Sequence, residues 1–123
     1  MSTVLIIEDN EKNMKLARDV LQAKGYKTLE AVTGEEGVTL ARQHVPDLVL
    51  MDIQLPGING IEAFKQIRAD AKTAKVPVVA LTASVTPTDR SAITAAGFDA
   101  FVSKPINLKE FLDTVKRLVE AKN

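Results

Sequence analysis

The sequence has 123 residues, the size of one ordinary domain and too short for two. Its 16 Lys and Arg residues balance 16 Asp and Glu residues, so it lacks the basic excess that draws proteins to nucleic acids or anionic membranes. It has no cysteine, which excludes disulfides and thiol chemistry and is compatible with a reducing compartment. We expect one domain over residues 1–123, located in the cytoplasm and without direct nucleic-acid contacts.

No segment has the character of a leader or a membrane anchor. The N-terminus lacks the basic region and small-residue cleavage site of a signal peptide. No apolar run approaches the roughly 20 residues that a membrane-spanning helix needs. We therefore expect no membrane association.

Short apolar runs rich in Val, Ile and Leu alternate along the chain with longer stretches of helical periodicity. This alternation is typical of βαβ units and a parallel sheet. Strands are predicted at residues 4–7, 28–32, 48–51, 76–81 and 100–102. The first, third and fourth of these runs lack polar alternation, as expected of strands that are covered on both faces.

Helix signals lie between the predicted strands. Asn10 is expected to cap a first helix that stops at Gly25, and Thr33 and Glu36 have the spacing of a capping box for the second. The third helix is expected to follow the turn at residues 56–57. The apolar faces of the first and third helices are predicted to carry Met14, Ala17, Val20, Leu21, Ile61, Phe64 and Ile67.

The last two predicted helices differ in the apolar area that they offer. The fourth has Thr86 as its cap and Pro87 as its first residue, ends before Gly97, and has only Ile93 and alanines to bury. The fifth is capped by Asn107 and is expected to dock strongly through a continuous stripe. The stripe comprises Leu108, Phe111, Leu112, Val115, Leu118 and Val119.

Five strands and five helices in strict alternation predict a doubly wound (βα)5 three-layer α/β sandwich with right-handed crossovers. The strand order cannot be read from periodicity, and the expected order is the flavodoxin-like 2-1-3-4-5. With that order, the ends of the first and third strands flank the switch point at which such sheets bind ligands.

Charged and polar side chains follow four of the predicted strands, namely Glu8 with Asp9, Asp52, Thr82 and Lys104. The carboxyl ends of parallel strands share one edge, so these side chains should converge. Crowded carboxylates repel one another unless a cation joins them, and ligands that are all oxygen favour Mg2+. Asp52 also has the chemistry of a nucleophile that takes up a phosphoryl group, while Lys104 and Mg2+ would offset charge on the transferring oxygens.

Four segments carry a family resemblance. Residues 8–10, 51–57, 81–83 and 104–105 read Glu-Asp-Asn, Met-Asp-Ile-Gln-Leu-Pro-Gly, Leu-Thr-Ala and Lys-Pro. Together they resemble the landmarks of the response regulator receiver family, the CheY-like superfamily, and the resemblance spans the whole chain. Residues 8–16 and 51–56 resemble most closely the DivK-type single-domain response regulators and the receiver modules of hybrid kinases.

The resemblance implies a role for each residue of the acidic group. Asp52 would accept the phosphoryl group. Asp9, Asp52 and the backbone carbonyl of Gln54 would ligate Mg2+, and Glu8 would act through a metal-bound water. Lys104 would pair with the phosphoryl group.

The resemblance also implies a conformational switch. Thr82 would be its hydroxyl, Ala83 would contact the phosphoryl group, and Phe101 would change rotamer with Thr82. Without the resemblance, Phe101 would be interpreted as an ordinary core residue. The peptide bond between Lys104 and Pro105 is expected to be cis, a form that is otherwise rare before proline.

The partners follow from the same resemblance. His44 is the sole histidine, so the chain offers no internal phosphohistidine relay and its donor is expected to be a histidine kinase or a histidine phosphotransferase. We expect a monomer that is not an enzyme beyond self-phosphorylation from small donors and self-dephosphorylation. Without an output domain, it would signal by binding a downstream protein on the face made by the fourth helix, the last strand and the fifth helix.

Three alternatives remain open at this point. A haloacid dehalogenase-like phosphatase also uses an Asp at a strand end, but it carries a second Asp where this sequence has Gln54. A flavodoxin-like cofactor binder would share the fold, yet the acidic residues 8–11 would repel phosphate. The chain could also be a receiver excised from a longer protein, although its Met1 start and short tail favour a complete one.

Overall fold

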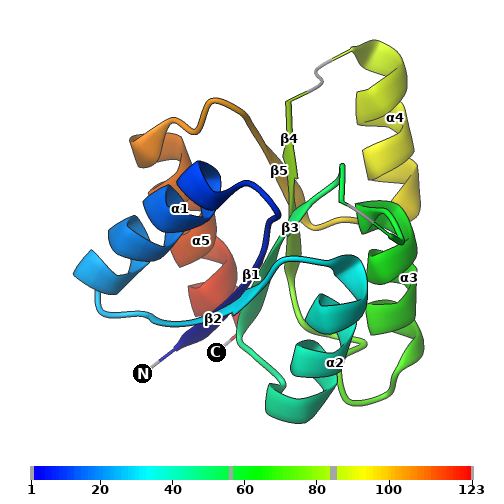
Figure 1. Cartoon of the computed structure of the whole chain (residues 1–123), viewed down its shortest axis with the longest axis horizontal. Coiled ribbons are helices and arrows are strands. Elements are labelled where there is room, and N and C mark those ends of the chain that lie inside the picture. Colours follow the sequence, from blue (N-terminus) through cyan, green and yellow to red (C-terminus); the bar gives the residue numbers. More distant parts are fainter. Residues whose placement is uncertain (1, 56, 84–85, 123) are drawn as a thin grey trace.

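The computed structural model describes residues 2–55, 57–83 and 86–122. Within these residues, parallel strands and intervening helices alternate strictly along the chain (Figure 1). The strands are β1 (Thr3–Ile7), β2 (Lys27–Ala31), β3 (Leu48–Asp52), β4 (Val78–Thr82) and β5 (Ala100–Ser103). The helices are α1 (Glu11–Ala23), α2 (Gly34–His44), α3 (Gly60–Ala69), α4 (Pro87–Ala96) and α5 (Leu108–Lys122).

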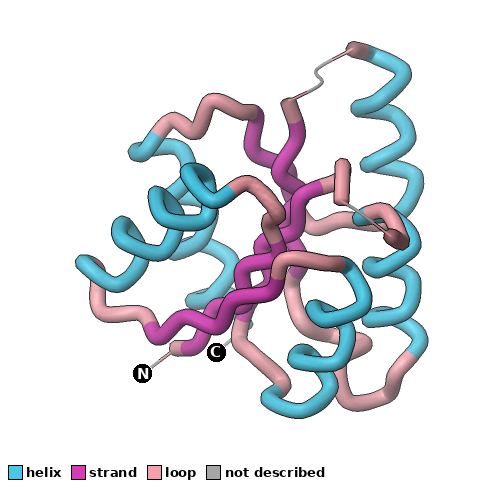
Figure 2. Tube along the Cα trace, in the orientation of Figure 1, coloured by secondary structure: helices cyan, strands magenta, loops and turns pink. Residues whose placement is uncertain are grey.

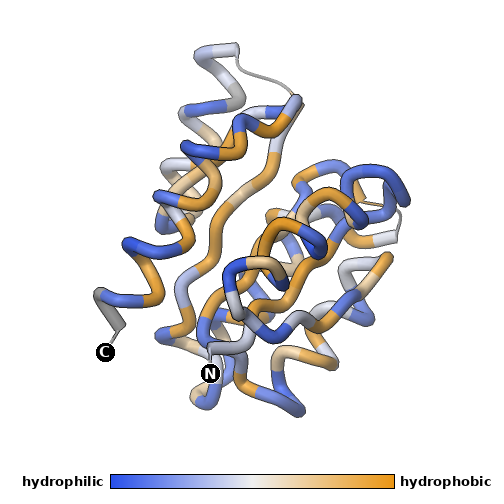
Figure 3. The backbone as a smooth tube through the Cα atoms, turned by 90° about the vertical axis from the view of Figure 1, so that its left-hand side faces the viewer, coloured by the Kyte–Doolittle hydropathy of each residue, from blue (hydrophilic) through white to orange (hydrophobic). Residues whose placement is uncertain are grey.

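The sheet has the order β2-β1-β3-β4-β5, and every strand pair is parallel. Helices α1 and α5 cover one face, and α2, α3 and α4 cover the other (Figure 1, Figure 2). The predicted fold class and strand order are therefore confirmed. The hydrophobic residues follow the strands through the middle of the molecule, and hydrophilic residues interrupt the helices (Figure 3).

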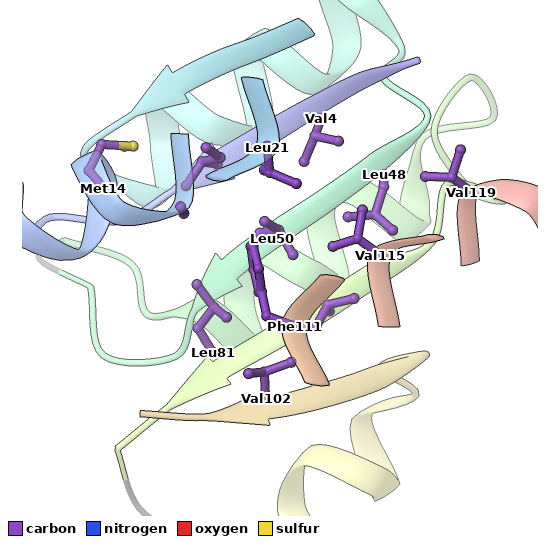
Figure 4. Packing of buried hydrophobic residues seen from close by; sticks show 13 residues of the cluster. Val4, Met14, Leu21, Leu48, Leu50, Leu81, Val102, Phe111, Val115 and Val119 are labelled. Carbon is purple, nitrogen blue, oxygen red and sulfur yellow. The ribbon is translucent and has the colours of Figure 1, made fainter. Parts of the chain in front are cut away.

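Each face of the sheet has its own core. Under α1 and α5, alternate strand residues such as Leu48 and Leu50 pack against Leu21, Phe111 and Val115 (Figure 4). The residues between them face the other way, and the core on that side includes Leu5, Ile7, Val49, Met51, Val38, Phe64 and Ile67. The central strands are thus buried on both faces, which explains why their sequences lack polar alternation.

Polar side chains fix the helix starts as the sequence indicated. Asn10 accepts a hydrogen bond from the backbone N–H of Asn13, and Asn107 accepts one from Glu110. Asn59 caps α3 in the same way, by accepting from the backbone of Glu62. The cap of α3 was not predicted, although its Asn-x-x-Glu spacing could have been recognised.

The capping box of α2 differs from the prediction by one residue. Thr33 accepts from the backbone N–H of Glu36, as expected. The Glu36 carboxylate, however, accepts from the backbone N–H of Val32 at 3.3 Å and does not close the box on Thr33. The Thr33 side chain still satisfies one free N–H of the first turn, so the helix start remains capped.

The predicted strands differ from the observed ones by one or two residues at their ends, and the second and fourth differ most. The second begins at Lys27 and stops before Val32, whose side chain is 52% exposed, so the prediction of 28–32 lies one residue too late. The fourth is two residues shorter at its start than the prediction of 76–81, because Val76 instead donates its N–H to the carbonyl of Thr73 and Pro77 has no N–H to donate.

The last two helices dock as differently as predicted. Among the described side chains of α4, Ile93 is the buried one, at 3% exposure. Helix α5 buries Phe111, Val115 and Val119. Leu108 was expected in the same stripe and is a correction, since it is 47% exposed at the first position of the helix, before the chain reaches the core.

Across the described ranges, none of the helices combines the length and the apolar character that crossing a bilayer requires.

Candidate functional site

The carboxyl edge of the sheet gathers the polar residues singled out in the sequence. Glu8 and Asp9 follow β1, whereas Asp52 and Thr82 are the last residues of β3 and β4. Lys104 follows β5 directly. The order of the strands puts β1 next to β3 and β3 next to β4, so residues far apart in sequence meet at one edge.

Three carboxylates form a compact group at this edge. One oxygen from each of Glu8, Asp9 and Asp52 lies within 4.8 Å of the others. Glu8 is 1% exposed and Asp52 is 4% exposed, while Asp9 is open to solvent. An all-oxygen group of this size, buried on one side and open on the other, could hold a hard divalent cation.

Lys104 bridges the two buried carboxylates. Its Nζ lies 2.7 Å from Glu8 Oε1 and 3.1 Å from Asp52 Oδ2. Both contacts are ion pairs, and the one with Glu8 is the shorter. Glu8 was expected to act only through water, and no spacing in the sequence indicated its direct ion pair with Lys104.

Backbone contacts fix the position of Lys104. The N–H of Lys104 donates to the carbonyl of Thr82 at 2.8 Å, which ties the loop after β5 to the end of β4. The peptide bond between Lys104 and Pro105 is cis, as the resemblance led us to expect. The hydrogen bond to Thr82 holds the backbone of Lys104 beside the end of β4.

Asp52 is held by the loop that follows it. Its Oδ1 accepts the backbone N–H of Gln54 at 3.0 Å, and the N–H of Ile53 donates to the carbonyl of Leu81. The N–H of Gly60 donates to the carbonyl of Ile53. A Cβ at Gly60 would collide with the carbonyl oxygen of Asp52, so only glycine lets the start of α3 pack this closely behind the carboxylate.

The protonation equilibria reflect this crowding. Burial raises the pKa of Glu8 above its usual range, and the neighbouring Asp52 raises it further, against the lowering influence of Lys104. Burial by itself would lower the pKa of Lys104, but Glu8 and Asp52 more than offset this effect, so its pKa is raised. Because its pKa is raised, Lys104 remains an ammonium at neutral pH.

Thr82 and Phe101 lie on the same face of the sheet. Thr82 is in register with Ser103, and Ala80 is in register with Phe101, so the two side chains are diagonal neighbours on adjacent strands. Thr82 is buried and Phe101 is half-buried. Ala83 follows Thr82 at the same edge and is exposed. One contact of Phe101 was not foreseen, because the guanidinium of Arg90 on α4 lies over its ring.

A depression of about 440 Å3 opens beside the acidic group. Glu8 and Asp9 form one end of it, and Met14, Arg18 and Val32 lie along its walls. The depression thus adjoins Glu8 and Asp9 on the side of α1.

The family model that describes the response regulator receiver domain matches residues 4–116. This chain belongs to the response regulator receiver family. The receiver domain is 46% identical, over 114 residues, to the polar-differentiation response regulator DivK of Brucella ovis, and the alignment covers 93% of each protein. It is thus a DivK-like and CheY-like receiver, as the sequence segments had indicated.

Solved structures of other receivers have the same fold. The receiver domain of a sensor histidine kinase from Pseudomonas aeruginosa, solved with magnesium coordinated in its active-site cleft, superposes with a TM-score of 0.91 at 30% identity, covering 97% of this chain and 98% of that one. The chemotaxis protein CheY4 of Vibrio cholerae gives a TM-score of 0.90 at 26% identity, covering 96% and 98%. Receiver domains act with histidine kinases or phosphotransferases and bind Mg2+ at an acidic pocket, to which the group of Glu8, Asp9 and Asp52 corresponds.

Proposed function

We propose that this receiver accepts a phosphoryl group on Asp52 from a histidine kinase or a histidine phosphotransferase, in a Mg2+-dependent reaction, and then signals by binding another protein. The observation that carries the proposal is the convergence of three carboxylates and one ammonium at the ligand-binding edge of the sheet. Structural needs alone would scatter these charges, because a buried group of like charges costs folding free energy.

The donor set fits Mg2+. The three carboxylates and Lys104 leave a net charge of −2, which one divalent cation balances. The carboxylate of Glu8 lies within 4.8 Å of those of Asp9 and Asp52, close enough to reach a water on a metal that they hold. Asp9, Asp52 and the backbone carbonyl of Gln54 would be the direct ligands and Glu8 would act through water. Bound there, Mg2+ would supply positive charge to the transferring oxygens.

The transfer itself needs little more than positioning. A carboxylate oxygen of Asp52 forms a bond to phosphorus as the phosphorus–nitrogen bond of the donor phosphohistidine breaks, and the imidazole leaves with the electron pair. Lys104, held at 3.1 Å from Asp52, pairs with the charge on the phosphoryl oxygens. Thr82 and Ala83 contact the same oxygens. Transfer of the phosphoryl group to water returns Asp52 to its carboxylate. Catalysis by this protein would thus be limited to its own phosphorylation and dephosphorylation.

The output is a change in surface. Thr82 moves toward the phosphoryl oxygens and Phe101 turns inward to fill the space that it leaves, and their positions as neighbours on one face support this coupling. The face made by α4, β5 and α5 is the expected site for the downstream protein. We infer a monomeric, cytoplasmic regulator that contacts neither nucleic acid nor a membrane. A coupling free energy of about 1–3 kcal/mol would change partner affinity by roughly 5- to 150-fold.

Intact-mass measurement tests the proposal. Incubation with acetyl phosphate or with a panel of histidine kinases should add one phosphoryl group when Mg2+ is present and none when it is chelated. Asp52→Asn should abolish the addition, and Asp113→Asn, which removes an exposed carboxylate of α5, should not. Phosphopeptide mapping that finds full labelling in Asp52→Asn would sink the assignment.

Asp9→Asn examines the metal site separately. It should weaken Mg2+ binding and slow phosphorylation while leaving the fold intact, because Asp9 is solvent-exposed. Without Mg2+ its melting temperature should stay level or rise, since one of three crowded carboxylates is gone. Steady multiple-turnover hydrolysis of an aryl phosphate by the wild type would instead favour a phosphatase.

A further inference from the structure

Arg90 on α4 makes a contact that the proposed function does not use. Its guanidinium carbon lies 5.0 Å from the centroid of the Phe101 ring on β5. A guanidinium within about 6 Å of an aromatic centroid is attracted by the negative face of the ring. Arg90 is exposed and Phe101 is half-buried, so the pair closes the surface between helix and strand.

The contact matters because α4 buries few side chains. Ile93 is the buried member among the described side chains of this helix, and Ala96 at its end is half-buried against the core that includes Phe64. The helix stands at the outer edge of the molecule beside β4 and β5 (Figure 1). The cation–π contact therefore adds to the attachment of α4 to β5.

The geometry also links this contact to the phosphorylation site. Phe101 and Thr82 are diagonal neighbours on the sheet face that α4 covers. A ring that turns toward Thr82 moves away from the surface on which Arg90 lies. An inward turn of the ring would therefore weaken its contact with Arg90.

We propose that Arg90 is a positioning residue of the switch, which stabilises Phe101 in its half-buried position and holds α4 against β5 until the ring turns inward. The inference rests on the proposed function, because the inward turn of Phe101 is the step that Arg90 opposes. Release of the ring then releases the helix in the same event. Arg90 thereby stabilises the non-signalling conformation, and the phosphoryl group must overcome this stabilisation to shift the equilibrium to the signalling state.

Beryllofluoride binding tests this inference, since beryllofluoride with Mg2+ stands in for the phosphoryl group on Asp52 and needs no partner protein. Titration followed by backbone amide resonances should show that Arg90→Met binds it about 2- to 5-fold more tightly than the wild type, the factor that an exposed cation–π contact corresponds to. Arg117→Met removes the same charge from an exposed position of α5 and should leave the affinity unchanged.

A second variant separates the contact with the ring from a general effect of charge. In a Phe101→Leu background, Arg90→Met should no longer change beryllofluoride affinity, because the ring that Arg90 holds is absent. In the wild type, the side-chain protons of Arg90 should show an upfield ring-current shift without beryllofluoride, and this shift should be lost when it binds. If Arg90 had only a structural role, its ring-current shift would not depend on whether beryllofluoride is bound at Asp52.

The outcomes separate the two proposals. If the wild type binds beryllofluoride but Arg90→Met binds it equally or less tightly, or if the tightening persists in Phe101→Leu, Arg90 does not restrain the switch. If the wild type fails to bind beryllofluoride with Mg2+, the proposed function itself is wrong, and the role of Arg90 is rejected with it.

Discussion

Helices α4 and α5 flank the same edge strand, β5, on opposite faces of the sheet, and they are attached to it in different ways. Helix α5 inserts Phe111, Val115 and Val119 into the core. Helix α4 inserts Ile93 and rests otherwise on surface contacts. Three large buried side chains fix α5, whereas one buried side chain and weaker contacts, among them that of Arg90 with Phe101, hold α4.

Two adjacent residues of β5 face the two helices. Val102 faces α5 and is 1% exposed in the core, and Phe101 faces α4 and is half-buried. A movement of Phe101 can therefore alter the α4 side while Val102 keeps the α5 side in register. A signalling surface needs this combination, since a helix can shift cheaply only when its neighbours stay in place.

The largest expected effect comes from removing the anchor of α5. Phe111→Ala should lower the free energy of unfolding by about 3–5 kcal/mol, because a fully buried ring leaves a cavity that the neighbouring strands cannot close. Urea denaturation measures the loss. Leu108→Ala on the same helix is the control and should change stability by less than about 0.5 kcal/mol, since Leu108 is largely exposed. Similar losses for both variants would contradict the account of α5.

The corresponding change in α4 should cost less. Ile93→Ala should lower the free energy of unfolding by about 2 kcal/mol, near the low end for a buried isoleucine, because a weakly held helix can settle into the space. Hydrogen exchange should accelerate in α4 amides and remain unchanged in α5. Ile67→Ala, in the well-buried helix α3, should cost more. Equal costs at positions 67 and 93 would remove the distinction between the helices.

A smaller effect is expected at the start of α5. Asn107→Ala should cost about 1 kcal/mol, the usual value for losing a side chain that caps a helix, because the N–H of Glu110 loses its acceptor. Thermal unfolding of this variant and of Asn59→Ala, which removes the equivalent cap of α3, should give similar shifts. A loss as large as that of Phe111→Ala would mean that α5 depends on its cap rather than on its core contacts.

The last prediction gives only the direction in which stability changes with pH. It asks whether the ion pair of Lys104 also stabilises the loop that leads into α5. Burial raises the pKa of Glu8, the ion-pair partner of Lys104. A carboxyl group whose pKa is higher in the folded chain contributes stability fully below its unfolded pKa and loses that contribution as pH rises through the folded value. Without Mg2+, the wild type should therefore lose stability relative to Glu8→Gln as pH rises from the usual carboxyl range through the raised pKa.

Urea denaturation of both proteins across this pH range checks the sign. Added Mg2+ should suppress the loss, because a divalent cation favours the ionised carboxylates. A wild type that gains stability over Glu8→Gln with rising pH would show that the ion pair stabilises the entry to α5 by itself.

Much of the fold could be predicted from the sequence because its local signals agree with one another. The caps Asn10 and Asn107 and the apolar stripe of α5 each indicated the element that forms. The misplaced ends have a common cause. Val32 and Val76 are apolar residues at the ends of apolar runs, and composition does not reveal that their backbones leave the sheet ladder.

The membership of the acidic group was predictable for a different reason, since parallel strands bring their carboxyl ends to one edge whatever their order along the chain. What the sequence could not supply was the pairing inside the group. The ion pair of Lys104 with Glu8 and the stacking of Arg90 on Phe101 depend on side-chain directions, which spacing along the chain does not determine.

Gly60 has a consequence for how mutations would be distributed in this protein. Its missing side chain leaves the room in which the carbonyl of Asp52 meets the start of α3. A saturation scan scored on phosphorylation should find position 60 as intolerant of every side chain as the acidic residues are, although glycine has no group that could contact phosphate or metal. The mutational footprint of the site would thus extend to a residue that takes no chemical part in it, and a search restricted to reactive side chains would overlook that residue.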